Sequence, residues 1–121
     1  MFDPNFIYQL LKHLETEDVP IYVDLQNDEY PKQHEKYVVI ERVVNDSNAV
    51  KGDGKRLLNR IEFNIRIFTS NATDNIMIYQ QYANALNDSD IPINFNFLGP
   101  TINPASGRYS SVIIGNYNYG Q

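Results

Sequence analysis

The chain has 121 residues, a formal net charge of -5 and no cysteine. A chain of this length is expected to fold as one domain, residues 1–121, around one hydrophobic core. The absence of cysteine excludes disulfides, thiol nucleophiles and thiolate metal sites. No apolar run approaches the roughly 20 residues of a membrane-spanning helix, and the first residues lack the features of a signal peptide. We therefore expect a cytosolic protein with no membrane contact.

Charge is distributed unevenly along the chain. Residues 1–41 contain nine Asp or Glu and three Lys or Arg, whereas residues 51–66 contain five basic and two acidic residues. The acidic total argues against direct nucleic-acid binding, which favours a basic face. Two interpretations remain open: two solvated faces, or acidic and basic faces through which neighbouring copies meet in an assembly.

The N-terminal part predicts an amphipathic helix. Asp3 and Pro4 form a helix-start signal, and Val19-Pro20 ends the pattern. The apolar residues that fall on one face are Phe6, Ile7, Leu10, Leu11 and Leu14.

An acidic segment, Glu15, Glu17 and Asp18, follows at the expected C-terminus of this helix. The helix dipole disfavours negative charge there, so a basic neighbour would explain the segment better than local helix stability does.

Three strands are expected next. Residues 21–25 are a short β-branched run, a polar loop follows over residues 26–36, and residues 37–44 form a longer strand. Residues 59–69 alternate strictly between apolar and polar side chains, which predicts a central strand with one buried face. Its buried face consists of Ile61, Phe63, Ile65 and Ile67.

The connection over residues 45–58 is expected to be a flexible, basic hairpin tip. It contains Gly52, Asp53 and Gly54, and it is flanked by Lys51, Lys55 and Arg56. Two glycines and several charges offer little apolar surface to offset the entropy of ordering, so residues 48–55 should be mobile in the free protein.

The second half predicts one helix and two strands. The helix is expected over about residues 74–87, with Ile76, Tyr79, Ala83 and Leu86 on one face. Residues 91–97 alternate, and Pro92 points to an edge position or a strand start. A turn over residues 99–107 leads to a final strand over residues 108–119, and the polar segment 115–121 is expected to end at the surface.

The order of elements is α-β-β-β-α-β-β. It predicts an α+β fold, with a single mixed or antiparallel sheet and two helices packed on it.

No motif indicates catalysis. His13 and Glu17 have the spacing of two metal ligands on a helix, but no third ligand accompanies them. The chain also lacks a complete phosphate loop and a nucleophile elbow. We therefore expect no enzymatic activity, no catalytic residue, no metal and no cofactor.

Tyrosine is abundant, with nine residues against no tryptophan. Such residues are enriched in protein interfaces, but they also form the half-buried rim of many cores, and both interpretations remain open. Two groups stand out: Tyr109, Tyr117 and Tyr119 on the last strand, and Tyr8, Tyr79 and Tyr82 on the helices.

Taken together, the elements resemble a known family. An N-terminal amphipathic helix, a strand pair joined by a Gly-rich charged loop, the strand IEFNIRIF, a second helix and the closing segment SGRYSSVIIGNYNYG are similar to the tail-terminator, or tail-completion, proteins of long-tailed bacteriophages. The resemblance covers nearly the whole chain and depends on element order, size and the closing segment. It implies a structural protein of the virion neck, assembled in the host cytoplasm. Its ring, expected to be a hexamer, would cap the tail tube and dock to the head-completion or connector protein.

If copies form such a ring, two oppositely charged segments are the expected contact. The acidic side is Glu15, Glu17 and Asp18, and the basic side is Lys51, Lys55, Arg56 and Arg60. The alternative function, from another class, is a small cytosolic domain that binds a ligand or a protein through its sheet and basic loop.

Overall fold

The computed structural model describes residues 6–23, 36–48, 58–90 and 92–120 of the chain. The fold is α+β with the predicted order α-β-β-β-α-β-β. The helices are α1 (Phe6–Leu11), continued by the 3-10 helix η1 (Lys12–Leu14), and α2 (Ala72–Asn87). The strands are β1 (Ile21–Val23), β2 (Tyr37–Asn48), β3 (Leu58–Thr69), β4 (Ile93–Asn103) and β5 (Arg108–Gly120).

The five strands form one mixed sheet in the order β1-β2-β3-β5-β4. β1 runs parallel to β2, and the other neighbours are antiparallel. The strand predicted to be central, β3, is indeed the middle strand. β4 begins directly after Pro92 and lies at an edge of the sheet, as the proline predicted.

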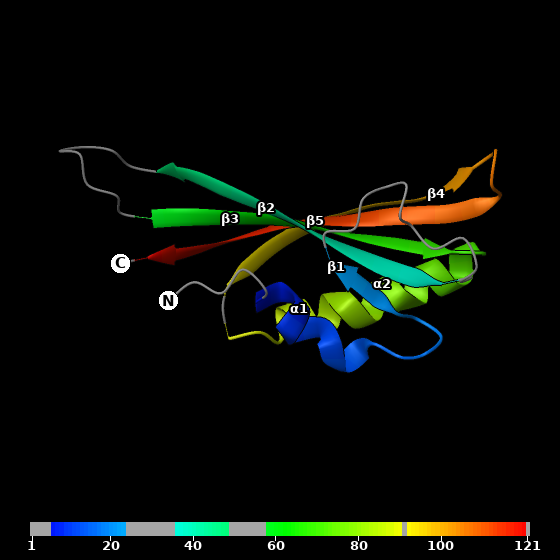
Figure 1. The fold of residues 1–121 in the computed structure, drawn as a ribbon, viewed down its shortest axis with the longest axis horizontal. Coiled ribbons are helices and arrows are strands. Elements are labelled where there is room, and N and C mark those ends of the chain that lie inside the picture. The colour runs from blue at the N-terminus through cyan, green and yellow to red at the C-terminus, as the bar shows by residue number, and fades with distance from the viewer. Residues whose placement is uncertain (1–5, 24–35, 49–57, 91, 121) are drawn as a thin grey trace.

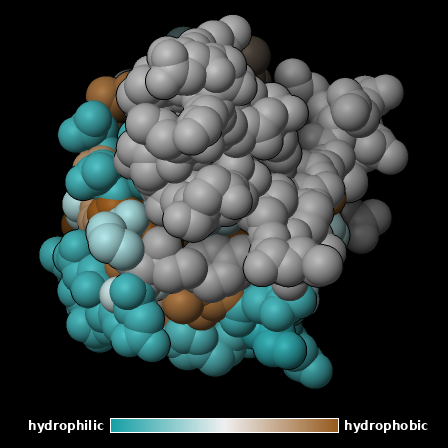
Figure 2. Space-filling view, turned by 90° about the vertical axis from the view of Figure 1, so that its left-hand side faces the viewer, coloured by the Kyte–Doolittle hydropathy of each residue, from teal (hydrophilic) through white to brown (hydrophobic). Residues whose placement is uncertain are grey.

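Both helices lie on one side of the sheet (Figure 1), so in the described part of the chain the other face has no helical layer. The sheet is strongly twisted, and at one end β2, β3 and β5 extend beyond the helices. Seen from that end, hydrophilic residues dominate the lower border of the described surface, on the helix side, with hydrophobic residues between them (Figure 2). Of the helices in the described part, none is long and apolar enough to cross a lipid bilayer.

The core lies between the sheet and the helices. Along β3, Phe63, Ile65 and Ile67 are at most 1% exposed and pack toward the helices, which confirms the predicted alternation for these three; the side chain of Ile61 lies outside the description. β1, β2, β5 and the two helices complete this cluster with Ile7, Leu11, Ile21, Val38, Ile40, Ile78, Tyr82, Leu86, Ile113 and Tyr117.

The buried stripe of α2 differs in part from the prediction. Leu86 and Ala83 are buried as expected, but Ile76 and Tyr79 are only half-buried, because the stripe runs through Ile78 and Tyr82 instead. The half-buried Tyr79 stacks on Phe97 of β4 with ring centroids 3.8 Å apart. The prediction used only apolar residues, whereas the first fully buried position of α2 is a polar residue, Asn75. The predicted face was therefore wrong in part.

Asn75 fixes the start of α2 to the sheet. Its side-chain NH₂ group lies 3.2 Å from the Ile67 carbonyl oxygen and 3.3 Å from Thr69 Oγ1, and its Oδ1 accepts a hydrogen bond from the Ser111 hydroxyl. Asn75 and Thr69 are fully buried and Ser111 is 4% exposed. This satisfied polar cluster joins α2, β3 and β5 inside an otherwise apolar core.

Several predicted boundaries were wrong. The first helix ends at Leu14, so the acidic segment lies in a turn. The expected turn over residues 99–107 is shorter, because β4 continues to Asn103 through a register shift between Leu98 and Thr101. This bulge contains Gly99, whose φ of 113° favours glycine, and a cis Gly99-Pro100 peptide.

The polar segment 115–121 was expected to end at the surface, but its first residues belong to the core. Gly115 and Tyr117 are buried within β5. A Cβ atom at Gly115 would overlap the ring of Phe63 in the adjacent strand, so glycine at this position allows the phenylalanine to lie flat across β5.

Candidate assembly surfaces

The three acidic residues predicted as an interface do not behave alike. Glu15 is used inside its own chain: Oε2 accepts from the Ile21 backbone N–H at 3.0 Å, and Oε1 accepts from the Tyr8 hydroxyl at 3.2 Å. The hydrogen bond and the negative charge of Glu15 raise the pKa of Tyr8. Glu15 therefore holds the start of β1 against α1 and is a poor candidate for an intermolecular contact.

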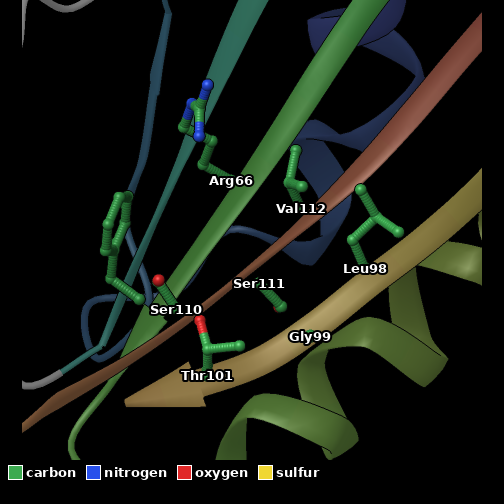
Figure 3. A pocket seen from close by; sticks show the side chains of 8 residues that line it. Arg66, Leu98, Gly99, Thr101, Ser110, Ser111 and Val112 are labelled. Carbon is green, nitrogen blue, oxygen red and sulfur yellow. The ribbon is translucent and has the colours of Figure 1, made fainter. Parts of the chain in front are cut away.

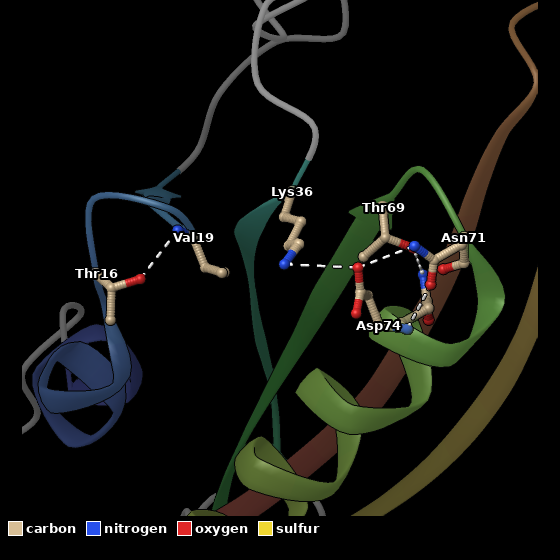
Figure 4. A network of polar contacts seen from close by, with 7 residues as sticks. Thr16, Val19, Lys36, Thr69, Asn71 and Asp74 are labelled. Carbon is tan, nitrogen blue, oxygen red and sulfur yellow. Dashed lines mark hydrogen bonds and ion pairs between the residues drawn. The ribbon is translucent and has the colours of Figure 1, made fainter.

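Glu17 and Asp18 are exposed, as Glu15 is. Their turn is closed by Thr16, whose hydroxyl accepts from the Val19 backbone N–H at 3.0 Å. In Figure 4 this turn faces the first part of α2 across a gap. The acidic half of the predicted interface is thereby reduced to two solvent-facing carboxylates.

Between this turn and α2 lies a groove with a volume of about 220 Å³, here called the acidic groove. It is lined by Leu14, Thr16, Asp18, Val19, Lys36, Asp74, Met77, Ile78 and Gln81. Its lining has two carboxylates, Asp18 and Asp74, against one lysine. Its floor is apolar, and Met77 stands at its border with 54% of its surface exposed.

The far wall of the acidic groove is held by the cap of α2. Asn71 Oδ1 accepts from the Asp74 backbone N–H at 2.8 Å, as an N-cap residue does. The Asp74 carboxylate accepts from Asn71 Nδ2 at 3.0 Å and lies 3.5 Å from Lys36 Nζ (Figure 4). The position of this carboxylate is thus set by the fold.

A second hollow lies on the open face of the sheet, the face opposite the two helices. This open-face pocket has a volume of about 240 Å³ and crosses β3, β5 and β4 (Figure 3). Its lining residues are Arg66, Phe68, Leu98, Gly99, Thr101, Ser110, Ser111 and Val112. Arg66, Val112 and Leu98 are direct cross-strand neighbours, so a cation and two apolar side chains share one row of the sheet.

One arginine, Arg66, lines the open-face pocket, and a second, Arg108, lies near its Phe68 wall. Arg66 Nε lies 2.9 Å from Glu41 Oε1. Arg108 lies over the ring of Tyr37, 5.4 Å from its centroid, and Tyr37 stacks on Phe68 of the pocket wall.

The open face also exposes large apolar side chains. Leu98 is 55% exposed and Ile114 is 44% exposed, on neighbouring strands. Water-exposed aliphatic side chains that are grouped, and bordered by polar ones, are typical of contact surfaces.

The basic half of the predicted interface remains a prediction. Lys51, Lys55 and Arg56, together with Gly52, Asp53 and Gly54 of the expected mobile tip, lie outside the described residues. Arg60 lies in β3, where its backbone pairs with Asn45 and Asn118. A contact between the acidic and basic segments of neighbouring copies therefore stays a prediction as well.

The tyrosines divide between the two interpretations that the sequence left open. Tyr82 and Tyr117 are buried in the core, which removes them from any surface. Tyr8, Tyr79 and Tyr109 are half-buried, and the side chain of Tyr119 lies outside the description.

Sequence reasoning missed the two hollows. The alternation of residues 59–69 predicts only that Arg66 lies on the polar face, no pattern singles out Met77, and Leu98 directly precedes the turn expected over residues 99–107. A signal was present in the last case: a large apolar residue that breaks the alternation of β4 next to Gly-Pro indicates a bulge with an exposed side chain.

No family model matches the chain, and no curated protein matches its sequence. The case for a function therefore depends on the residues and the fold.

Proposed function

We propose that this chain is a tail-terminator subunit of a long-tailed bacteriophage. In this role several copies, six by the resemblance, form a ring in the virion neck. The ring caps the tail tube and offers a surface to the head-completion or connector protein. Assembly takes place in the cytoplasm of the host cell.

One observation carries the proposal: the sheet is covered by helices on one face and bears exposed Leu98 and Ile114 on the other. A subunit that works alone has little reason to keep such side chains in water, whereas a subunit of a ring covers them on assembly. The α-β-β-β-α-β-β order on which the resemblance depends supports the same role.

In the described part of the chain, the sizes of the two hollows favour protein partners over small ligands. The open-face pocket and the acidic groove measure about 240 and 220 Å³, below the roughly 300–1,000 Å³ of sites that enclose drug-sized molecules. Each has room for one or two side chains of a partner.

The test is tail assembly in the presence and absence of the chain. The tail-tube protein of the same phage is polymerised alone and with the purified chain, and the tubes are imaged by negative-stain electron microscopy. We expect tubes of limited length with a ring at one end. Tubes of the same length distribution in both samples, with bare ends, would reject the proposal.

A binding domain of another kind is the second candidate, because the open-face pocket combines a cation, two hydroxyls and apolar walls. Such a domain would hold a carboxylate-bearing segment of a cytosolic protein. It predicts a monomer that binds its target one to one and leaves tube length unchanged, so the same experiment separates the two functions.

A further inference from the structure

The outer side of β4 has no partner strand in the described part of the chain. β4 comes last in the sheet order β1-β2-β3-β5-β4, so one of its sides faces β5 and the other faces away from the sheet. Residues 93–98, here called the edge segment, pair with β5 in regular register before the shift between Leu98 and Thr101. The backbone groups on the outer side of such a segment are a template for the addition of another strand.

The edge segment lacks the charges that commonly protect such strands. Natural edge strands often carry lysine or other charged side chains that discourage pairing. Residues 93–103 contain no Asp, Glu, Lys or Arg, although 21% of the whole chain is charged. Pairing is limited in length instead, by Pro92 before the segment and by the bulge and Pro100 after it. The edge segment can therefore accept a strand, but only a short one.

The hydrophobic core also reaches this edge. Ile93, Phe95 and Phe97 lie on the helix side and pack against the core, yet they are only half-buried. In the middle of the sheet, residues that face the helices, such as Ile65 and Ile113, are completely buried. A further strand with apolar side chains on its helix side would cover the exposed part of these three residues, so this edge favours a strand of that pattern.

The edge segment itself has the pattern that this edge requires. Starting from Phe95, the sequence reads asparagine and then an apolar residue in both directions. Two antiparallel copies with Phe95 opposite Phe95 therefore place Asn94 opposite Asn96 and Ile93 opposite Phe97. A twofold axis perpendicular to the sheet relates the copies, so the helices of both lie on the same side and the apolar side chains meet on that side.

We propose that the chain forms a dimer in which β4 pairs antiparallel with β4 of a second copy, with Phe95 opposite Phe95. The occupant is a second copy because its edge segment supplies an apolar face, an amide face and no charge in one register. An asparagine side chain has both donors and acceptors, so each Asn94–Asn96 pair can form a hydrogen bond across the strands. The dimer uses both β4 edges and leaves the three-residue β1 strands at the ends of the sheet, so it does not grow further.

This inference goes beyond the proposed function and does not depend on it. A twofold contact joins identical surfaces, whereas the contacts of a ring join different ones. The β4 pairing is therefore a property of the free chain, and the outcome of the tail-tube experiment leaves it unaffected.

The first experiment measures self-association by sedimentation velocity, from the micromolar range to about 1 mM, and tests the register by charge. Two double variants use the exposed positions Asn94 and Asn96. Asn94→Lys with Asn96→Lys places lysine opposite lysine and should raise the dissociation constant about tenfold or more. Asn94→Lys with Asn96→Glu places lysine opposite glutamate, so its dissociation constant should be at least about tenfold below that of the Lys/Lys variant.

The matched control adds the same charge elsewhere. Gln80→Lys with Asn84→Lys changes two exposed positions on α2. This variant should have a dissociation constant within about twofold of the wild type. A loss as large as that of the Lys/Lys variant of β4 would show that net charge, not the edge segment, controls the association.

The second experiment uses disulfides, because the chain has no cysteine and an introduced thiol has no competitor. Opposite residues of antiparallel strands have Cα atoms about 4.5–5.5 Å apart, within the range of a disulfide. Asn94→Cys and Asn96→Cys are opposite each other in the proposed register, whereas two copies of either variant alone place their Cα atoms roughly 8 Å apart. Mild oxidation should give at least about fivefold more linked dimer in the equal mixture than in either variant alone. Asn84→Cys, exposed on α2, measures linkage by random collision.

Every outcome decides the proposal. A dimeric wild type, the expected order of the two double variants and a preference for the mixed disulfide would support it. A wild type that is monomeric at about 1 mM would overturn it and leave the edge segment to a strand of another protein. Equal dissociation constants of the two double variants, or as much linked dimer in one cysteine variant alone as in the mixture, would overturn it as well.

Discussion

The two faces of the sheet differ in what covers them. The face under α1 and α2 is built from side chains that are almost fully buried and entirely apolar except for the Asn75 cluster. The open face carries an ion pair, hydroxyls and, on β4 and β5, exposed Leu98 and Ile114, whereas Tyr37 and Val39 of β2 are buried on this face. Along β4 and β5, alternation therefore separates residues that hold the fold together from residues available to a partner.

The strongest test of this division removes one large side chain from each face. Phe63→Ala should lower the free energy of unfolding by about 3–5 kcal/mol, because it leaves a cavity between sheet and helices. Leu98→Ala, on the open face, should cost less than about 1 kcal/mol. Urea titration of both variants measures the difference, and similar losses would show that the open face is covered within the monomer.

The polar cluster in the covered face should be nearly as sensitive. Asn75→Leu leaves the Ser111 hydroxyl and the Ile67 carbonyl without their partner, which should cost about 2–3 kcal/mol. Asn84→Leu, an exposed site on the same helix, is the control and should change stability by less than about 0.5 kcal/mol. Thermal unfolding followed by circular dichroism compares them, and equal stability of the two variants would contradict the role given to Asn75.

Gly115→Ala tests how closely the covered face is packed. The added methyl group meets the Phe63 ring, and the overlap should cost about 1–3 kcal/mol. Combined with Phe63→Leu, the loss should be smaller than the sum of the single losses, because the smaller side chain makes room for the methyl group. Strict additivity in a double-mutant cycle would show that the two residues do not interact.

The buried hydroxyl of Tyr82 makes the stability of the protein depend on pH in alkaline solution. Its hydroxyl is buried without a hydrogen-bond partner among the described residues, and burial, helped by the charge of Glu15, raises its pKa above the usual value of roughly 10. A raised pKa in the folded state means that stability is fully present below about pH 10 and is lost as the pH rises, since only the unfolded chain then releases the proton.

Tyr82→Phe should therefore unfold less readily than the wild type above about pH 10. At neutral pH it should be equal to the wild type or up to about 1 kcal/mol more stable, because no hydrogen bond is lost. Denaturant titrations at about pH 7 and about pH 10.5 measure both effects. A variant that loses as much stability as the wild type between these pH values would contradict this account.

The smallest effect is expected on the open face. Glu41→Gln removes the charge that pairs with the half-exposed Arg66, and exposed pairs contribute about 0.2–1 kcal/mol. The loss should shrink further in about 1 M salt, where charges are screened beyond about 3 Å. Denaturant titration at low and high salt checks this, and a salt-independent loss above about 2 kcal/mol would mean that the pair is buried.

The fold was largely predictable from residue patterns. The alternation of residues 59–69 identified the central strand and its buried side, and Pro92 marked the edge strand. The face of α2 was assigned wrongly because a hydrophobic pattern gives no weight to Asn75, whose burial depends on partners from two distant strands. Residues 99–103 were assigned to a turn because local Gly-Pro chemistry says nothing of the ladder that β5 provides.

The candidate surfaces were less predictable. Glu15, Glu17 and Asp18 are equivalent in the sequence, yet Glu15 accepts a hydrogen bond from the backbone of Ile21, because β1 begins beside it. Arg66 and Leu98 are 32 residues apart and become neighbours only through β5. A contact surface built across strands depends on register, which no single stretch of sequence contains.

The edges of the sheet limit how this protein can aggregate. An unpaired edge strand is a template on which further chains add by backbone hydrogen bonds, as in amyloid fibrils. Here one edge is β1, only three residues long. The other is β4, which is interrupted by the bulge at Gly99 and by Pro100, a residue without a backbone N–H to donate. Within residues 6–23, 36–48, 58–90 and 92–120, neither edge offers a long regular ladder, which favours contacts between side chains over open-ended β-stacking.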